Sequence, residues 1–167
     1  MKQPSFAIAA PVAACLSLLI SCCSPLAPGG RAAGADPILL MSWNVLSLFD
    51  PIDDGDEYAE YSVERGTWNE ARYRARLDAL AGAVLKAKPA GRQGPSGPDI
   101  LCLVEIEKKS ILDDLAKGPL SKCGYRFRAF AKAEGSAIGL GLLSRLPIES
   151  ARAWGLDLGK GRERPIL

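Results

Sequence analysis

Apolar positions fall into two kinds of segment along this chain, and the first lies at the N-terminus. Residues 6–20 form an apolar run that is interrupted only by Pro11 and Ser17 and preceded by Lys2. The run is shorter than the roughly 20 apolar residues that a membrane-spanning helix needs. A positive residue before a short apolar run is typical of a secretory signal peptide, so we assign residues 1–21 to one and expect export.

The end of this segment carries a possible lipid attachment point. Residues 19–22 (Leu-Ile-Ser-Cys) resemble a bacterial lipobox, which makes Cys22 the expected lipidated residue. Cys23 is an alternative acceptor, and ordinary cleavage without lipidation is another reading. Because several acyl chains on one residue anchor stably, we expect a membrane-anchored lipoprotein in the periplasm or on the cell surface. Residues 22–37 then form the lipidated cysteine and a flexible tether rich in Pro, Gly and Ala.

The second kind of segment begins at Ile38. Apolar runs of strand length occupy residues 38–45 and 99–105, and their continuity predicts strands that are buried on both faces. Apolar residues recur at helical spacing over 73–85, after a capping Asn69 and before Pro89, and a second helix is expected over 110–117 with Ser110 as its cap. Further extended segments are expected at 125–131, at 137–144, from 147 and from 164. This order of elements predicts an α/β fold for residues 38–167.

An acidic loop lies between the first strand and the first helix. Six carboxylates occur between Asp50 and Glu60, which suggests calcium. The EF-hand pattern does not fit, because its third and twelfth positions counted from Asp50 are Ile52 and Tyr61. We therefore favour a solvated acidic loop over a calcium loop.

Cysteine and histidine usage limits the chemistry further. Outside the N-terminal segment only Cys102 and Cys123 remain, and Cys102 lies within an apolar run, so we expect buried thiols and no disulfide. The chain has no histidine and no Cys-x-x-Cys, which excludes a structural zinc site of the usual kind. The net charge of +2 neither favours nor opposes binding to nucleic acid.

Two polar residues stand where the predicted buried strands end, Asn44 and Glu105. Side chains at the carboxyl ends of strands in an α/β sheet converge on one crevice. A carboxylate beside an amide there is a suitable seat for Mg²⁺ or Mn²⁺, since hard cations prefer oxygen ligands. From spacing alone, ordinary turn or surface roles for both residues remain the alternative.

Four segments together resemble the endonuclease/exonuclease/phosphatase family, the relatives of deoxyribonuclease I. They are residues 42–45 (Ser-Trp-Asn-Val), 98–107 around Glu105, 140–148 with Ser-Arg-Leu-Pro, and 164–167 (Arg-Pro-Ile-Leu). The resemblance implies a four-layer α/β/β/α sandwich, with residues 38–167 forming its N-terminal portion. One departure is Val104, which stands where the family usually has glutamine.

The resemblance also implies roles for particular residues. Glu105 would bind the metal and Asn44 would help to orient metal or phosphate, so both become candidate catalytic and metal-site residues for hydrolysis of a phosphodiester, with DNA as one candidate. Arg145 and Arg164 are candidate phosphate contacts, with structural ion pairs as the alternative. Gly139 and Gly141 form a weak phosphate-loop signal, and we favour close packing in the sheet for them.

The family's later, histidine-containing motifs are not found in this sequence. We therefore expect a truncated domain that is inactive alone and needs a separately encoded C-terminal half for activity. The alternative is a non-catalytic surface lipoprotein fragment that acts in binding or has no function.

Overall fold

The computed structural model describes residues 37–88, 93–157 and 163–167. The predicted signal peptide and all of the tether up to residue 36, with Cys22 and Cys23, lie outside the described residues. Among the residues described, no helix is long and apolar enough to cross a membrane.

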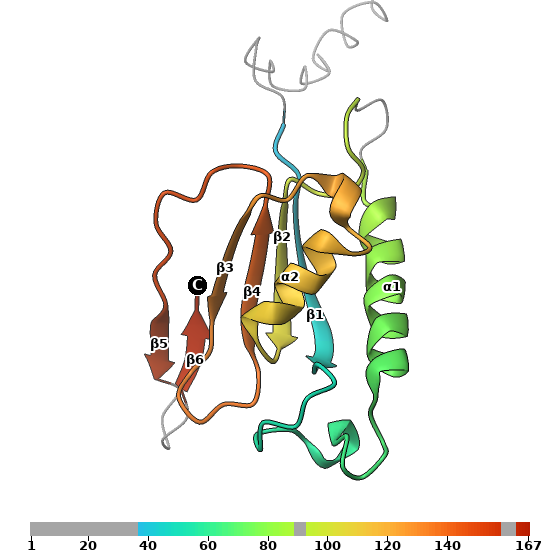
Figure 1. The fold of residues 1–167 in the computed structure, drawn as a ribbon. Helices are drawn as coiled ribbons and strands as arrows, with labels where there is room; N and C mark the ends of the chain where they lie inside the picture. The colour runs from blue at the N-terminus through green and yellow to red at the C-terminus, as the bar shows by residue number, and fades with distance from the viewer. Residues whose placement is uncertain (1–36, 89–92, 158–162) are drawn as a thin grey trace, which may run out of the picture. The chain divides into compact units, whose positions relative to one another are not determined.

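The framework is a four-stranded sheet built from β1 (Leu40–Leu48), β2 (Ile100–Ile106), β3 (Phe127–Ala131) and β4 (Gly139–Ser144), in the order β1-β2-β4-β3 (Figure 1). β1 and β2 are parallel, whereas β4 runs antiparallel to both of its neighbours. The carboxyl ends of β1 and β2 therefore lie at the same edge of the sheet. A second, antiparallel pair is formed by β5 (Trp154–Asp157) and β6 (Glu163–Ile166).

Two helices cover one face of this sheet. They are α1 (Glu70–Lys86), which connects β1 to β2, and α2 (Lys109–Lys117), which follows β2. Their apolar residues share one core with Leu101, Leu103 and Leu143 of the strands. Short 3₁₀ turns occur at Ala59–Tyr61 and Ser121–Cys123. The mixed α/β class predicted from the sequence is confirmed.

The predicted helix ends fare differently. Asn69 caps α1 as expected, because its side chain accepts a hydrogen bond from the backbone N–H of Arg72 at 3.0 Å. The prediction that Ser110 caps α2 is wrong. That helix begins at Lys109, its N-cap position is Lys108, and no side chain caps it. Gly118 ends α2 as predicted.

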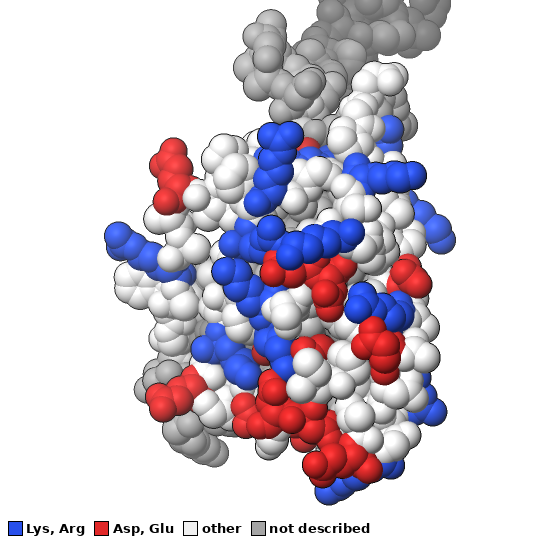
Figure 2. Space-filling model, in the orientation of Figure 1, with Lys and Arg blue, Asp and Glu red and all other residues white. Residues whose placement is uncertain are grey.

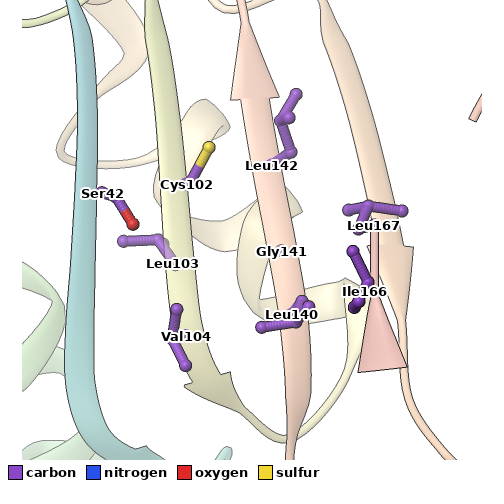
Figure 3. Close-up of a pocket in the computed structure, with 9 residues that line it drawn as sticks. All are labelled: Ser42, Cys102, Leu103, Val104, Leu140, Gly141, Leu142, Ile166 and Leu167. Carbon is purple, nitrogen blue, oxygen red and sulfur yellow. The ribbon is translucent and has the colours of Figure 1, made fainter. Parts of the chain in front are cut away.

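Strand burial also corrects an expectation. Residues of β2 alternate between fully buried positions, such as Leu101 and Leu103, and half-buried positions, such as Cys102 and Val104. In β1, Leu40 is 58% exposed, so the strands are not buried on both faces. The helices cover one face, and a cavity of about 280 Å³ lies on the other face. The carboxyl-terminal residues Ile166 and Leu167, at the end of β6, line this cavity together with residues of β1, β2 and β4 (Figure 3).

The two glycines of β4 owe their presence to close packing, as expected. A Cβ on Gly139 would lie 2.3 Å from the carbonyl oxygen of Ala131 in the neighbouring strand. A Cβ on Gly141 would lie 2.3 Å from Ile106 Cδ1 and 2.8 Å from Leu112 Cδ2. Gly141 thus lets α2 settle against β4 directly behind the end of β2.

Candidate functional site

The structure brings Asn44 and Glu105 together at the carboxyl ends of β1 and β2. Asn44 Nδ2 donates to Glu105 Oε1 at 2.7 Å, although the two residues are 61 positions apart. Asn44 Oδ1 accepts from the backbone N–H of Leu46 at 2.8 Å. Because one end of the amide donates and the other accepts, the Asn44 side chain is fixed in one orientation. Asn44 therefore holds a carboxylate oxygen of Glu105 in a defined place.

The backbone around this pair adopts a conformation that is rare for these residue types. Among the described residues, positive φ outside glycine occurs at Leu46 (56°), Ser47 (59°) and Glu105 (70°). Such left-handed residues cost of order 1–3 kcal/mol each and cluster at functional sites. Leu46 and Ser47 follow Asn44 by two and three positions, and the third left-handed residue is Glu105 itself. The strain is thus concentrated at the predicted site.

The left-handed residue in β2 forms a bulge that redirects Glu105. Between Val104 and Ile106 the register of β2 is interrupted, both in its pairing with β1 and in its pairing with β4. Continued alternation after Leu103 would have pointed Glu105 into the helix-covered core. Instead Ile106 takes the fully buried position, and Glu105 is only half-buried. The bulge therefore frees a carboxylate from the core and presents it beside Asn44.

The matching turn after Asn44 is held by a side chain from α1. Arg76 Nη2 donates to the carbonyl of Val45 at 2.8 Å and also to that of Leu46, while Nη1 donates to the Tyr61 hydroxyl at 3.1 Å. These bonds use carbonyl groups that the edge strand leaves without a ladder partner. Arg76 thus supports the backbone that carries Asn44.

Glu105 is the carboxylate at this strand end that could hold a divalent cation. Glu105 supplies one carboxylate, and Ser47 Oγ lies 3.5 Å from its Oε2, at the limit of a hydrogen bond. Magnesium commonly takes one or two carboxylates and keeps several waters for a substrate phosphate. Asn44, whose Nδ2 cannot ligate a cation, orients the carboxylate. Glu105 is consequently the residue here that would hold the metal.

Arg145 lies away from this pair, at the other end of the sheet. It follows β4, which runs antiparallel to β2, and it faces Asp99, which precedes β2. Its guanidinium lies 3.3 Å from Asp99 Oδ1, donates to the carbonyls of Cys123 (2.6 Å) and Ser96, and stacks over Tyr125. This placement favours the structural ion pair over the phosphate contact. Arg164 lies in β6, and its side chain is outside the described part of the structure.

The acidic loop is more ordered than the sequence suggested. Asp53 accepts backbone hydrogen bonds from Glu64 (2.9 Å) and Val63 (2.8 Å), which lower its pKa. Asp50 is only 5% exposed, and Lys108 Nζ lies 3.1 Å from its Oδ2. The expectation of a solvated loop is therefore wrong for Asp50, which is buried, whereas Asp53 is partly exposed and held by backbone hydrogen bonds.

Glu107 is a buried carboxylate that sequence reasoning missed. It is 1% exposed, and burial raises its pKa to about 7, although the backbone N–H of Asp50 and the ammonium of Lys108 oppose this. Partial burial acts to lower the pKa of Lys108, but its bonds to Asp54 and Asp50 outweigh this and raise it. The sequence offered only the alternation Glu105-Ile106-Glu107, and without knowledge of the bulge it does not tell which of these residues is buried. Ser47 and Arg76 were also missed, since neither belongs to a local motif.

The two remaining cysteines are free thiols in different surroundings. Cys123 is buried in the core beneath the helices, and Cys102 lines the shallow cavity on the opposite face. Burial raises the pKa of both thiols.

These features define a class: a mixed α/β domain that presents a carboxylate and an amide at the ends of adjacent parallel strands. A family model described as the endonuclease/exonuclease/phosphatase family matches residues 39–150, well over half of the chain. The chain therefore belongs to that family, and the predicted resemblance is confirmed. Members typically depend on a divalent metal ion. No match was found among curated proteins or among solved structures.

Proposed function

We propose that this chain carries part of the active site of a metal-dependent phosphoesterase that acts on phosphodiesters, with DNA as one candidate substrate. The observation that supports this is the Asn44–Glu105 hydrogen bond of 2.7 Å, set among left-handed residues at the ends of two parallel strands. Glu105 would bind Mg²⁺ or Mn²⁺. The metal, when bound, would neutralise charge on the substrate phosphate.

The chain's own residues prepare this site. Asn44 fixes one oxygen of Glu105 and leaves the other, Oε2, toward Ser47. Arg76 supports the turn that carries Asn44, so the pair is preorganised by the two strands and α1 together. Preorganisation matters because a site whose groups already point correctly loses no free energy to reorientation during the reaction.

Histidine is a common group for proton transfer in such a reaction, and the sequence contains none. A positioned acid or base contributes roughly a hundred- to ten-thousand-fold. We propose that histidine residues of another segment or chain supply this step. We further propose that the protein is exported and held at a membrane through lipidated Cys22.

The test of the site is binding of Mn²⁺ and hydrolysis of plasmid DNA by the purified full chain, compared with Glu105→Gln. The matched control is Glu149→Gln, because Glu149 is an exposed glutamate outside the site. We expect Glu105→Gln to weaken Mn²⁺ binding at least about tenfold and the control to leave it unchanged. Equal binding by all three proteins would refute the metal role of Glu105.

The catalytic part of the proposal needs its own measurement. We expect hydrolysis only when a histidine-bearing segment with the motifs Asn-x-His and Ser-Asp-His is added. Turnover by this chain alone that Glu105→Gln abolishes would show that no second segment is required. A chain that binds metal but is inert with every added segment would favour the alternative, a non-catalytic surface lipoprotein fragment.

A further inference from the structure

A second group of carboxylates lies apart from Glu105, where the loop after β1 meets the end of β2. One oxygen each of Asp54, Glu57 and Glu107 lies within 4.8 Å of the others. Figure 2 shows acidic side chains gathered at this lower end of the face that it draws. Two oxygens on opposite sides of a calcium ion, each about 2.4 Å from it, are separated by about 4.8 Å. The spacing of the three oxygens is therefore compatible with one coordination shell.

The loop is already folded around these groups. Glu57 accepts hydrogen bonds at its two oxygens from the backbone N–H groups of Asp54 and Gly55, the latter at 2.8 Å. Asp53 holds the following segment through Val63 and Glu64. Backbone contacts thus hold Glu57 and the loop around it in a defined conformation.

Glu107 supplies an independent reason to expect a ligand. Its side chain is 2% exposed, and Oε2 accepts from the backbone N–H of Asp50 at 2.8 Å. Oε1 is buried, lies 3.5 Å from the same Lys108 ammonium that contacts Asp54, and accepts no hydrogen bond from the described residues. A buried carboxylate oxygen without a hydrogen bond is costly, and its presence in a folded protein calls for a partner.

Lys108 is the competing explanation. Its ammonium is hydrogen-bonded to Asp54 and lies 3.1 Å from Asp50 Oδ2 and 3.5 Å from Glu107 Oε1. One ammonium, however, lies among the carboxylates of Asp50, Asp54 and Glu107, and Glu57 adds a further carboxylate to the group, so carboxylates outnumber the ammonium. The Lys108 side chain is also 24% exposed, so it has room to turn toward solvent.

We propose that Asp54, Glu57 and Glu107 form a binding site for a divalent cation of the calcium type, in which the cation displaces the ammonium of Lys108. Three carboxylates on a loop suit Ca²⁺, which accepts six to eight oxygen ligands in flexible geometry, better than Mg²⁺, which takes fewer carboxylates. This site is separate from the proposed phosphoesterase site at Glu105. Its cation would tie the loop after β1 to the end of β2.

The experiment is calcium titration of the full chain by calorimetry, with thermal unfolding measured in CaCl₂ and in EDTA. We expect one Ca²⁺ to bind and to raise the unfolding temperature. Glu107→Gln and Glu57→Gln should each weaken binding by about tenfold or more. Glu105→Gln and the surface control Glu149→Gln should leave calcium binding unchanged, which separates this proposal from the phosphoesterase site.

Lys108→Met discriminates between the two explanations. If a cation displaces the ammonium, removing the ammonium should tighten calcium binding by about tenfold or more, since a competing positive charge is lost. If Lys108 is the only counter-ion, the variant should bind no calcium and should unfold at a lower temperature with or without CaCl₂. That result, or the absence of binding by the wild-type chain, would overturn the proposal. Should Glu107→Gln fail to fold, Glu57→Gln decides, because Glu57 lies in a loop and is only partly buried.

Discussion

Replacing Gly141 by alanine places a methyl group between β4 and α2, where the structure has no space for one. The new Cβ would lie 2.3 Å from Ile106 Cδ1, and 2.8 and 3.2 Å from the two methyl carbons of Leu112. Ordinary contacts between carbon atoms are about 3.5–4.0 Å. At least one neighbour must therefore move by more than about 1 Å.

The cost follows from where these neighbours lie. Ile106 and Leu112 are both fully buried, so their methyl groups can rotate only into a filled core. Overpacking of this kind typically costs about 1–3 kcal/mol, a sizeable part of the 5–15 kcal/mol that stabilises a domain. We expect Gly141→Ala to lower the free energy of unfolding by about 2 kcal/mol.

The assay is urea unfolding followed by circular dichroism, with Gly82→Ala as the matched control. Gly82 lies on the exposed side of α1, and a Cβ there would meet nothing within 4 Å. Alanine in a helix interior is favoured over glycine by about 0.8–1.0 kcal/mol. With slopes of about 1–3 kcal/mol per molar urea, the midpoint should fall by about 1 M for Gly141→Ala and rise for Gly82→Ala.

A Gly141→Ala variant as stable as the wild type would show that α2 does not pack against β4 as described. A Gly82→Ala variant that is destabilised to the same extent would show that glycine is required in both elements for a reason unrelated to packing.

Three further predictions follow from single contacts. Arg76→Lys should lower the free energy of unfolding by about 1–2 kcal/mol, measured by urea unfolding, and should weaken Mn²⁺ binding at Glu105, measured by metal titration. The reason is that the Lys ammonium cannot bond to the carbonyls of Val45 and Leu46 as the guanidinium does. Tyr73→Phe should cost about 1–2 kcal/mol in urea unfolding, since it removes the 2.7 Å hydrogen bond to Asp114, and an unchanged midpoint would contradict that contact. In EDTA, the free energy of unfolding should fall by about 3 kcal/mol as the pH rises from about 4.5 to about 7. Burial raises the pKa of Glu107 to about 7, so the folded protein binds this proton more tightly than the unfolded chain does and is stabilised by it at low pH. Glu107→Gln should flatten the slope of stability against pH, and a slope that persists in that variant would contradict the assignment.

Local signals were sufficient for the helices. The spacing of Tyr73, Leu77 and Leu80 and the cap at Asn69 are properties of one short segment, and α1 follows them closely. α2 begins at Lys109, one residue before the predicted start at Ser110. Lys108, directly before the helix, forms ion pairs with Asp50 and Asp54, which are distant in the sequence.

The strands show what a local pattern cannot reveal. A continuous apolar run such as Leu39 to Met41 is compatible with burial on two faces or on one, because the covering layer comes from elsewhere in the chain. The pairing of Asn44 with Glu105 could be anticipated from their places at strand ends. The left-handed backbone at Glu105 could not, since glutamate has no preference for that conformation. The meeting of Asp54 with Glu107 depends on contacts between distant segments for the same reason.

The parallel pairing of β1 with β2 also sets an order of events during synthesis. β1 is an edge strand whose ladder partner in the sheet is β2, and Glu105 leaves the ribosome 61 residues after Asn44. At translation rates of about 5–20 residues per second, β1 waits for about 3–12 seconds. During that interval the residues of α1 have already been synthesised, but the β2 residues against which they pack have not. The Asn44–Glu105 pair therefore forms late, and a nascent chain that stalls before residue 106 presents β1 unpaired to chaperones and to other chains.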